Sequence, residues 1–319
     1  MNLRTVKKDF LHNWPIYLLA LPIFVYFIIW NYLPMIGNML AFEDYSARGG
    51  FLFSKWVGLK NFADFFQSYY LWRTIRNTLV LSILSIIVNF PAPIIFALLL
   101  NEIENEMFKK VIQTISYMPY FVSTVVICGI IIDFFSYNGA ITTMLVKLGI
   151  RVETDLKSFG LSMPTNFANT DLLNIKSFFR PIYVLSGTWQ GLGYGSIIYL
   201  AALSGVDQEL YEAAKIDGAG RWQQTIHITL PSIAPTVIIM LILTISSLLN
   251  TSMEKIILLY RPITYEVSDV ISSFVYRRAF VDHDYGYSTA VGLFNSFVSL
   301  MLLFIANSLS RRYSETSLF

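Results

Sequence analysis

Long apolar stretches without a single acidic or basic side chain dominate this chain. Six such stretches occur, and each holds at least 22 residues. A membrane-spanning helix needs about 20 apolar residues, and a charge at the centre of a bilayer is costly. The pattern therefore predicts six membrane-spanning helices. Their predicted positions are residues 15–36, 77–100, 111–135, 181–204, 230–251 and 285–309.

Six spans place both ends of the chain on the same side of the membrane. Short basic segments beside span ends favour the cytoplasmic side. We therefore expect both termini in the cytoplasm, together with the polar segment 205–229. The pairs Lys109-Lys110 and Arg311-Arg312 lie directly against span ends. The internal segments hold nine basic residues in all: Arg4, Lys7, Lys8, Lys109, Lys110, Lys215, Arg221, Arg311 and Arg312.

Composition agrees with a bilayer as the solvent. Hydrophobic residues make up 55% of the chain and charged residues 14%, whereas soluble domains average about 25% charged. We expect an all-α membrane protein that forms one transmembrane domain, residues 1–319, surrounded by lipid. A net charge of +2 without a basic patch gives no indication of nucleic-acid binding.

Cysteine and histidine give no indication of a metal site. Cys128 is the only cysteine, which excludes a disulfide within the chain and a cysteine-based metal site. His12, His227 and His283 are scattered without the spacing of metal ligands. The sequence therefore predicts neither a bound metal nor a cofactor of its own.

One polar segment, Asp207 to Pro231, differs in kind from the rest of the chain. Asp207 can cap a helix through its carboxylate, and Glu209 lies in the first turn, where the helix dipole favours negative charge. Gly218 and Gly220 predict the end of that helix, since glycine accepts a left-handed turn. A short cytoplasmic helix could serve as a docking element or lie flat on lipid, and the physical pattern alone leaves both open.

The same segment resembles the EAA loop of permease subunits in bacterial ABC importers. That motif is Glu-Ala-Ala, three residues, Gly, nine residues and Ile-x-Leu-Pro; residues 212–214, 218 and 228–231 match it. The resemblance implies a coupling helix that docks in a cleft of the ATPase subunit. The residues that it assigns to this role are Glu212, Ala213, Ala214, Asp217 and Gly218.

Other motifs resemble the carbohydrate-uptake class of these permeases. They include Trp189 and the runs 199–203 and 216–219, while 118–123 and the Asn138-Gly139 turn are similar to the polysaccharide-type, LplB-like branch. The resemblance implies the type I ABC importer permease fold and a multi-pass subunit of the bacterial cytoplasmic membrane. It implies import of a sugar or oligosaccharide.

The implied partners follow from the family and from one missing motif. No Gly-x-x-x-x-Gly-Lys-Ser/Thr phosphate loop occurs in the sequence, so ATP and Mg²⁺ would be bound by partner subunits and the chain itself is not expected to be an enzyme. The resemblance implies a second homologous permease, two ATP-binding cassette ATPase subunits and an extracellular solute-binding lipoprotein.

Candidate substrate-pathway residues lie on the fourth and fifth predicted spans. On the fourth, one helix face at spacings i, i+3, i+4 and i+7 combines groups suited to sugar binding with glycines, although such glycines also serve helix packing. On the fifth, hydroxyl side chains form a stripe, although they could bond to their own backbone instead. The candidates are Gly187, Gln190, Gly191, Tyr194, Thr244, Ser247 and Thr251.

Three other functions remain as alternatives. An importer permease of the same family could carry a solute other than a sugar. A secondary transporter would usually need ionisable residues inside the spans, and a membrane-embedded enzyme would need acidic, histidine or serine–lysine groups at one depth. The charge-free spans supply neither set, so these last two functions are disfavoured.

Overall fold

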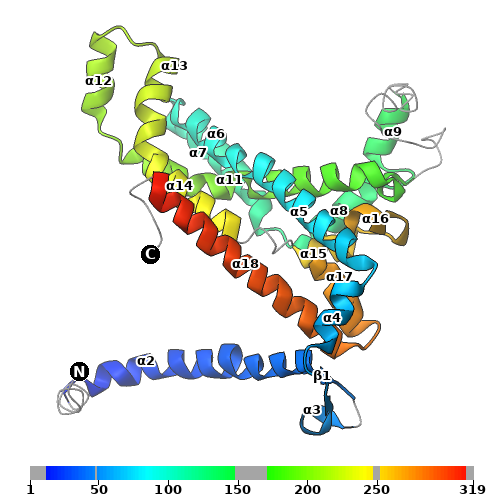
Figure 1. Cartoon of the computed structure of the whole chain (residues 1–319). Helices are drawn as coiled ribbons and strands as arrows, with labels where there is room; N and C mark the ends of the chain where they lie inside the picture. The colour runs from blue at the N-terminus through cyan, green and yellow to red at the C-terminus, as the bar shows by residue number, and fades with distance from the viewer. Residues whose placement is uncertain (1–11, 47–48, 148–170, 247–251, 314–319) are drawn as a thin grey trace. The chain divides into compact units, whose positions relative to one another are not determined.

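The computed structural model describes residues 12–46, 49–147, 171–246 and 252–313, and these ranges are almost entirely helical (Figure 1). The chain forms two compact units. The smaller comprises residues 1–67 and 278–293, and the larger comprises residues 68–277 and 294–319.

The smaller unit begins with a long apolar helix, Trp14–Phe42. The helix consists of α2 (Trp14–Phe27), the π-helical turn η1 (Ile28–Tyr32) and the 3-10 segment η2 (Leu33–Phe42). Two-residue strands β1 (Glu43–Asp44) and β2 (Lys55–Trp56) then pair antiparallel, a small departure from the predicted all-helical fold. The short helices α3 (Gly50–Phe53) and α4 (Lys60–Gln67) complete this part of the chain.

Polar and close backbone contacts hold the smaller unit together. The amide nitrogen of Asn61 donates to the carbonyl oxygens of Ala41 and Glu43, both at 3.0 Å. The helix α18 (Tyr285–Tyr313) starts beside this turn, and a Cβ at Gly286 would lie 2.5 Å from the Glu43 carbonyl oxygen. Glycine at 286 therefore allows the two backbones to approach.

The larger unit is a helical bundle around α11 (Lys176–Ser204), which packs against α5, α6, α7, α14 and α16. Its other elements are α5 (Tyr70–Asn89), α6 (Pro91–Asn101), α7 (Glu106–Tyr117), η3 (Met118–Phe121), α8 (Thr124–Phe135), α9 (Ala140–Lys147), η6 (Leu172–Asn174), α12 (Gln208–Ile216), α13 (Arg221–Gln224), η7 (Thr225–Thr229), α14 (Leu230–Ser246), α15 (Met253–Leu259), η8 (Pro262–Thr264) and α16 (Tyr265–Ser268). The helix α17 (Ile271–Phe280) and α18 each run through both units.

Five helical segments in the described residues are long and apolar enough to cross a membrane: Trp14–Phe42, Tyr70–Asn101, Thr124–Leu145, Arg221–Ile245 and Tyr285–Ile305. The predicted fourth span, 181–204, forms the 29-residue helix α11 but is not among the five. Glycine and polar side chains lower its hydropathy, and a helix surrounded by other helices needs no apolar surface on every side.

The predicted third span, 111–135, is not one continuous helix. It divides into α7, η3 and α8, and the apolar segment of this region runs from Thr124 to Leu145 instead. Pro119 has no backbone N–H to continue a helix. The hydroxyl of Ser123 accepts from the Val126 N–H and caps the start of α8.

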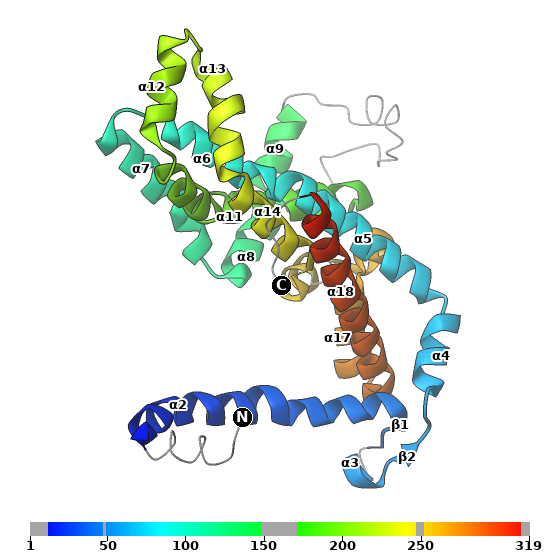
Figure 2. The same cartoon turned by 60° about the vertical axis from the view of Figure 1, so that its left-hand side comes forward.

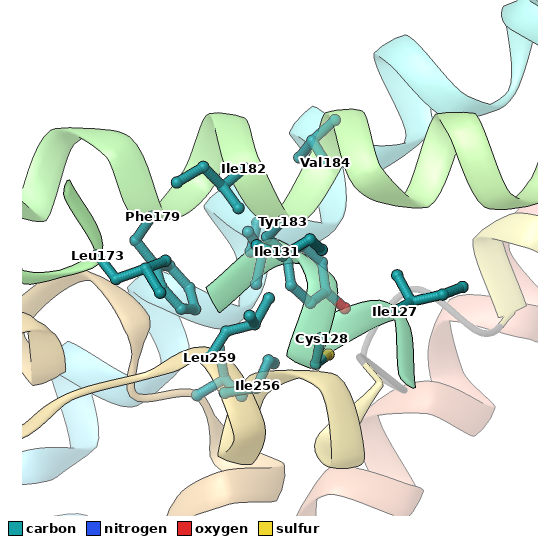
Figure 3. Close-up of a cluster of buried hydrophobic side chains, with 12 residues drawn as sticks. Ile127, Cys128, Ile131, Leu173, Phe179, Ile182, Tyr183, Val184, Ile256 and Leu259 are labelled. Atoms are coloured by element: carbon teal, nitrogen blue, oxygen red, sulfur yellow. The ribbon is translucent and has the colours of Figure 1, made fainter. Parts of the chain in front are cut away.

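A core of buried apolar side chains joins α5, α8, α11 and α15 in the larger unit. Figure 3 shows Cys128 of α8, Tyr183 of α11 and Ile256 of α15 at its centre. Cys128 and Ile256 are completely buried. This core fixes α15, the first helix after the fifth predicted span, against α11.

A buried ion cluster holds α16 and α17 against α5. Asp269 is fully buried, and its carboxylate accepts from Arg73 at 2.9 Å and from Arg277 at 2.7 and 3.2 Å. The Ser273 hydroxyl donates to the same carboxylate, and the Asn77 amide donates to the Asp269 carbonyl oxygen. One carboxylate therefore pairs with two partly buried guanidinium groups.

Candidate functional site

The segment that matches the EAA motif forms a helical hairpin. Figures 1 and 2 show α12 and α13 side by side at one end of the larger unit. As the sequence predicts, the Asp207 carboxylate caps α12, accepting from the Glu209 N–H at 3.0 Å. No residue of α12 is buried, and most of its side chains are exposed, so the helix offers an accessible face to another molecule.

Gly218 makes the turn after α12. Its φ is +76°, in the left-handed region that glycine accepts readily. A Cβ there would meet nothing within 4 Å among the described residues, so within this part of the chain only backbone strain opposes a side chain at this position. The prediction for Gly220 was wrong, because its φ is −71° and it serves as the N-cap of α13.

The hairpin is attached to the bundle at its base. The Tyr211 hydroxyl and the Thr229 hydroxyl form a hydrogen bond of 2.9 Å, which joins α12 to η7. The Arg221 guanidinium pairs with Glu102 at 3.5 Å and with Glu104 at 3.1 Å, in the turn before α7. Movement of the hairpin would therefore bear on both α14 and α7.

The residues assigned to coupling lie on the outer part of this hairpin. Glu212, Ala213, Asp217 and Gly218 are exposed, and Ala214 is half-buried. Ala214, Asp217 and Gly218 also line a pocket of about 410 Å³ between the end of α12 and α13. The arrangement presents small side chains and two carboxylates to the outside, with room for an inserted side chain.

A larger cavity, of about 470 Å³, lies inside the larger unit beside α11. Its volume falls within the range of about 300–1,000 Å³ typical of small-molecule sites. Four of the predicted pathway residues line it: Gly187, Gln190, Gly191 and Thr244. Hydroxyl and amide groups of α5 and α8, and the hydroxyl of Ser252, line it as well, which gives the cavity many hydrogen-bonding groups and few charges.

The other predicted pathway residues are placed differently. Tyr194 stacks on Tyr120 with 3.8 Å between ring centroids, and it does not line the cavity. Ser247 and Thr251 lie outside the described residues. The spacing of Tyr194 predicted that it shares a helix face with the other candidates. Its ring instead packs on Tyr120 of η3 and is not part of the cavity wall.

Sequence reasoning gave little or no weight to two groups that line the cavity. Ser82, Ser85 and Asn89 contribute polar side chains from one face of α5, and their spacing of three and four residues could have revealed them. Lys255 on α15 is the other omission. The signal was a lysine directly followed by the apolar run Ile256 to Leu259, just after the fifth predicted span.

Lys255 is buried, with 5% of its surface exposed. Its ammonium lies 5.1 Å from the centre of the Tyr183 ring, a cation–π distance. Burial lowers the pKa of Lys255 to about 8 because desolvation disfavours the charged form. The side chain is thus still mostly protonated at neutral pH.

Two glycines on α11 have opposite roles and give a testable contrast. A Cβ at Gly193 would lie 2.2 Å from the Ser116 carbonyl oxygen of α7, whereas a Cβ at Gly191 would meet nothing within 4 Å. We expect Gly193→Ala to lower the stability of the chain by about 1–3 kcal/mol through overpacking. Gly191→Ala should leave stability unchanged or slightly higher, since alanine favours helix.

The two variants are purified in the same detergent, and their melting temperatures are compared. The amount of each variant in the membrane is measured as well. Equal melting temperatures for Gly193→Ala and the unmodified chain would contradict the close backbone contact between α7 and α11.

Comparison with known proteins gives close relatives over nearly the whole chain. Protein LplB of Bacillus subtilis strain 168 is 40% identical over 314 residues, which cover 98% of this chain and 92% of LplB. The polygalacturonan/rhamnogalacturonan transport system permease protein YteP of the same organism is 39% identical, covering 95% and 90% of the two chains.

A solved structure is similar in fold as well as in sequence. A chain of a bacterial ABC transporter involved in the import of the acidic polysaccharide alginate matches with a TM-score of 0.85 and 38% identity, over 97% of this chain and 99% of that one. The model of a protein family, the inner membrane component of binding-protein-dependent transport systems, matches residues 89–315 and so includes the hairpin and the cavity. This chain belongs to that family of inner-membrane transport components.

Proposed function

We propose that this chain is the permease subunit of an ATP-binding cassette importer that carries a sugar or oligosaccharide into the cytoplasm. The observation that carries the proposal is the hairpin of α12 and α13, which matches the EAA motif and presents α12 with no buried residue. Permeases with sugar or polysaccharide transport in their names are 39% and 26% identical to this chain.

The cavity supports a polar solute. Its lining combines hydroxyl, amide and glycine positions, which suit hydrogen bonding to sugar hydroxyls. We propose that Gly187, Gln190, Gly191 and Thr244 line the pathway and that solute passes along α11. Tyr194 is proposed instead as a packing residue, because its ring stacks on Tyr120.

The proposed topology has six membrane-crossing helices, with α11 as the sixth beside the five apolar segments. Both termini and the hairpin then face the cytoplasm of a bacterium, where an ATPase subunit can reach α12. The orientation follows from the basic residues beside the span ends.

We propose that the working assembly contains a second permease, two ATPase subunits and an extracellular solute-binding protein. The chain has no phosphate loop, so energy has to come from ATPase subunits. The similar alginate transporter has been solved in complex with a periplasmic protein that holds an alginate pentasaccharide, which supports a binding protein as the donor of solute.

This assembly makes a prediction about ATP hydrolysis. The purified chain alone should hydrolyse no ATP, because it lacks the groups that hold nucleotide phosphates. Hydrolysis should appear in the complex with its ATPase subunits and increase when loaded binding protein is added to proteoliposomes. Phosphate release and uptake of labelled sugar are measured together.

The control is a complex whose ATPase subunits lack the phosphate-loop lysine, which should neither hydrolyse ATP nor import. ATP hydrolysis by the isolated chain, or sugar uptake that continues with the inactive ATPase, would refute the proposed function.

A further inference from the structure

The cavity in the larger unit carries a single charge. Among the described residues that line it, Lys255 is the only one with an ionisable acidic or basic side chain apart from its tyrosines. None of the ion pairs found in the described residues includes Lys255. Arg73 and Arg277, whose side chains are about one-fifth exposed, both pair with Asp269.

An ammonium group that is buried without an anion is costly, because desolvation is not repaid by an ion pair. The ring of Tyr183 offsets part of that cost. Since the pKa of about 8 keeps the group mostly protonated at neutral pH, the cavity holds a positive charge whose counter-charge is not supplied by the described parts of this chain.

A second donor lies next to the ammonium. A Cβ on Gly187 would lie 3.6 Å from the Lys255 Nζ and 3.3 Å from the Asn89 Nδ2. The Thr188 hydroxyl donates to the other end of the Asn89 amide, its Oδ1 atom. The amide nitrogen and the ammonium therefore border one notch, opened by the missing side chain of Gly187, and both groups can only donate.

We infer that this cavity takes an anionic saccharide, whose carboxylate or phosphate group is held at the notch by Lys255 and Asn89. The inference rests on the proposed function and narrows its substrate class. The hydroxyl-lined remainder of the cavity, which includes Ser82, Ser85 and Thr124, holds the sugar ring. A neutral sugar would leave the ammonium without a counter-charge.

The test uses the complete transporter in proteoliposomes with its binding protein. The probes are oligogalacturonates, alginate oligosaccharides and hexose phosphates, each next to a neutral counterpart: the carboxyl-reduced oligosaccharides and the free hexoses. Uptake is measured for the unmodified chain and for Lys255→Met, Lys255→Arg and Lys60→Met, the last removing an exposed lysine that does not line the cavity.

We expect uptake of an anionic probe, and Lys255→Met should lower it roughly ten- to hundredfold, as loss of a hydrogen bond to a charged group does. Lys255→Arg should keep most of the uptake, and Lys60→Met all of it. Methionine matches lysine in length, and the amount of complex recovered shows that each variant assembles. Preference for carboxylate over phosphate probes identifies which anion the notch holds.

Three outcomes would overturn the inference. Uptake of neutral probes alone, or equal uptake of anionic probes by Lys255→Met and the unmodified chain, excludes an anion at Lys255 and leaves sugar import standing. If no saccharide of either charge enters although ATP hydrolysis responds to loaded binding protein, the proposed sugar substrate fails together with the inference.

Discussion

Replacing Asp269 with alanine is expected to prevent stable folding of the larger unit. The substitution leaves Arg73 and Arg277 partly buried without the carboxylate that pairs with them, while Ser273 loses one of its two acceptors. Removing one partner of a buried ion pair typically costs about 3–5 kcal/mol, a large share of the stability of a protein. The amount of chain in the membrane and its melting temperature in detergent measure the effect.

Two further variants make this experiment specific. Asp269→Asn keeps the size of the side chain but not its charge, so it should still destabilise strongly. Asp282→Ala breaks an exposed pair with Arg278 at 3.2 Å and should change stability by less than about 1 kcal/mol. Similar melting temperatures for Asp269→Asn and the unmodified chain would show that the charge of Asp269 contributes little.

Gly218→Leu is expected to abolish coupling between ATP hydrolysis and transport. Leucine at a φ of +76° meets a backbone penalty of about 1–2 kcal/mol. Its side chain extends outward, because none of the described residues lies within 4 Å of its Cβ. The turn would change shape, and the new side chain would stand where we propose that the ATPase docks. Uptake should fall at least tenfold with normal membrane content.

The neighbouring glycine provides a matched control. Gly220→Leu occupies an extended backbone that any residue can adopt, so uptake should be far less affected. Gly218→Asn should recover part of the activity, because asparagine tolerates the left-handed conformation. Glu212→Lys reverses an exposed charge on the proposed docking face and should weaken ATPase retention without altering the turn. Normal co-purification, stimulated hydrolysis and uptake in both Gly218→Leu and Glu212→Lys would contradict the coupling role.

The family resemblance, read from the EAA motif and its neighbours, is confirmed by relatives at about 40% identity. Such a motif was visible in the sequence because the helix that carries it depends on short-range features: Asp207 begins the helix and Gly218 ends it. Both act within one or two turns of chain. The same local reasoning misjudged Gly220, since glycine is compatible with a left-handed turn but does not require one.

Long charge-free stretches predicted helices well where the absence of charged side chains is what distinguishes a long helix from its flanking segments. They even indicated α11, which hydropathy does not single out because polar side chains face its helical neighbours and the cavity. The failure over 111–135 has a different cause. Absence of charge does not reveal a helix break, whereas Pro119 and the capping Ser123 did carry that information.

The cavity itself depends on contacts between distant parts of the chain. Tyr194 has the spacing of a pathway residue, and only the fold brings Tyr120 beside it. Lys255 was overlooked because a lysine after a span is usually solvent-exposed, and its burial follows from the packing of α15 on α8 and α11. Long-range pairing of this kind cannot be deduced from helical periodicity alone.

The contact of Gly193 with Ser116 has a mechanical consequence. No side chain separates the two backbones. The contact between α7 and α11 therefore contains no flexible side chains that could adjust when one helix moves. The 12 residues of α7 form a strut about 18 Å long. Just before its first turn, Glu102 and Glu104 hold Arg221 of the hairpin, and its last turn abuts α11 two residues from Gly191 in the cavity wall. A displacement of the hairpin would therefore be transmitted through the rigid helix α7 to α11, which lines the cavity.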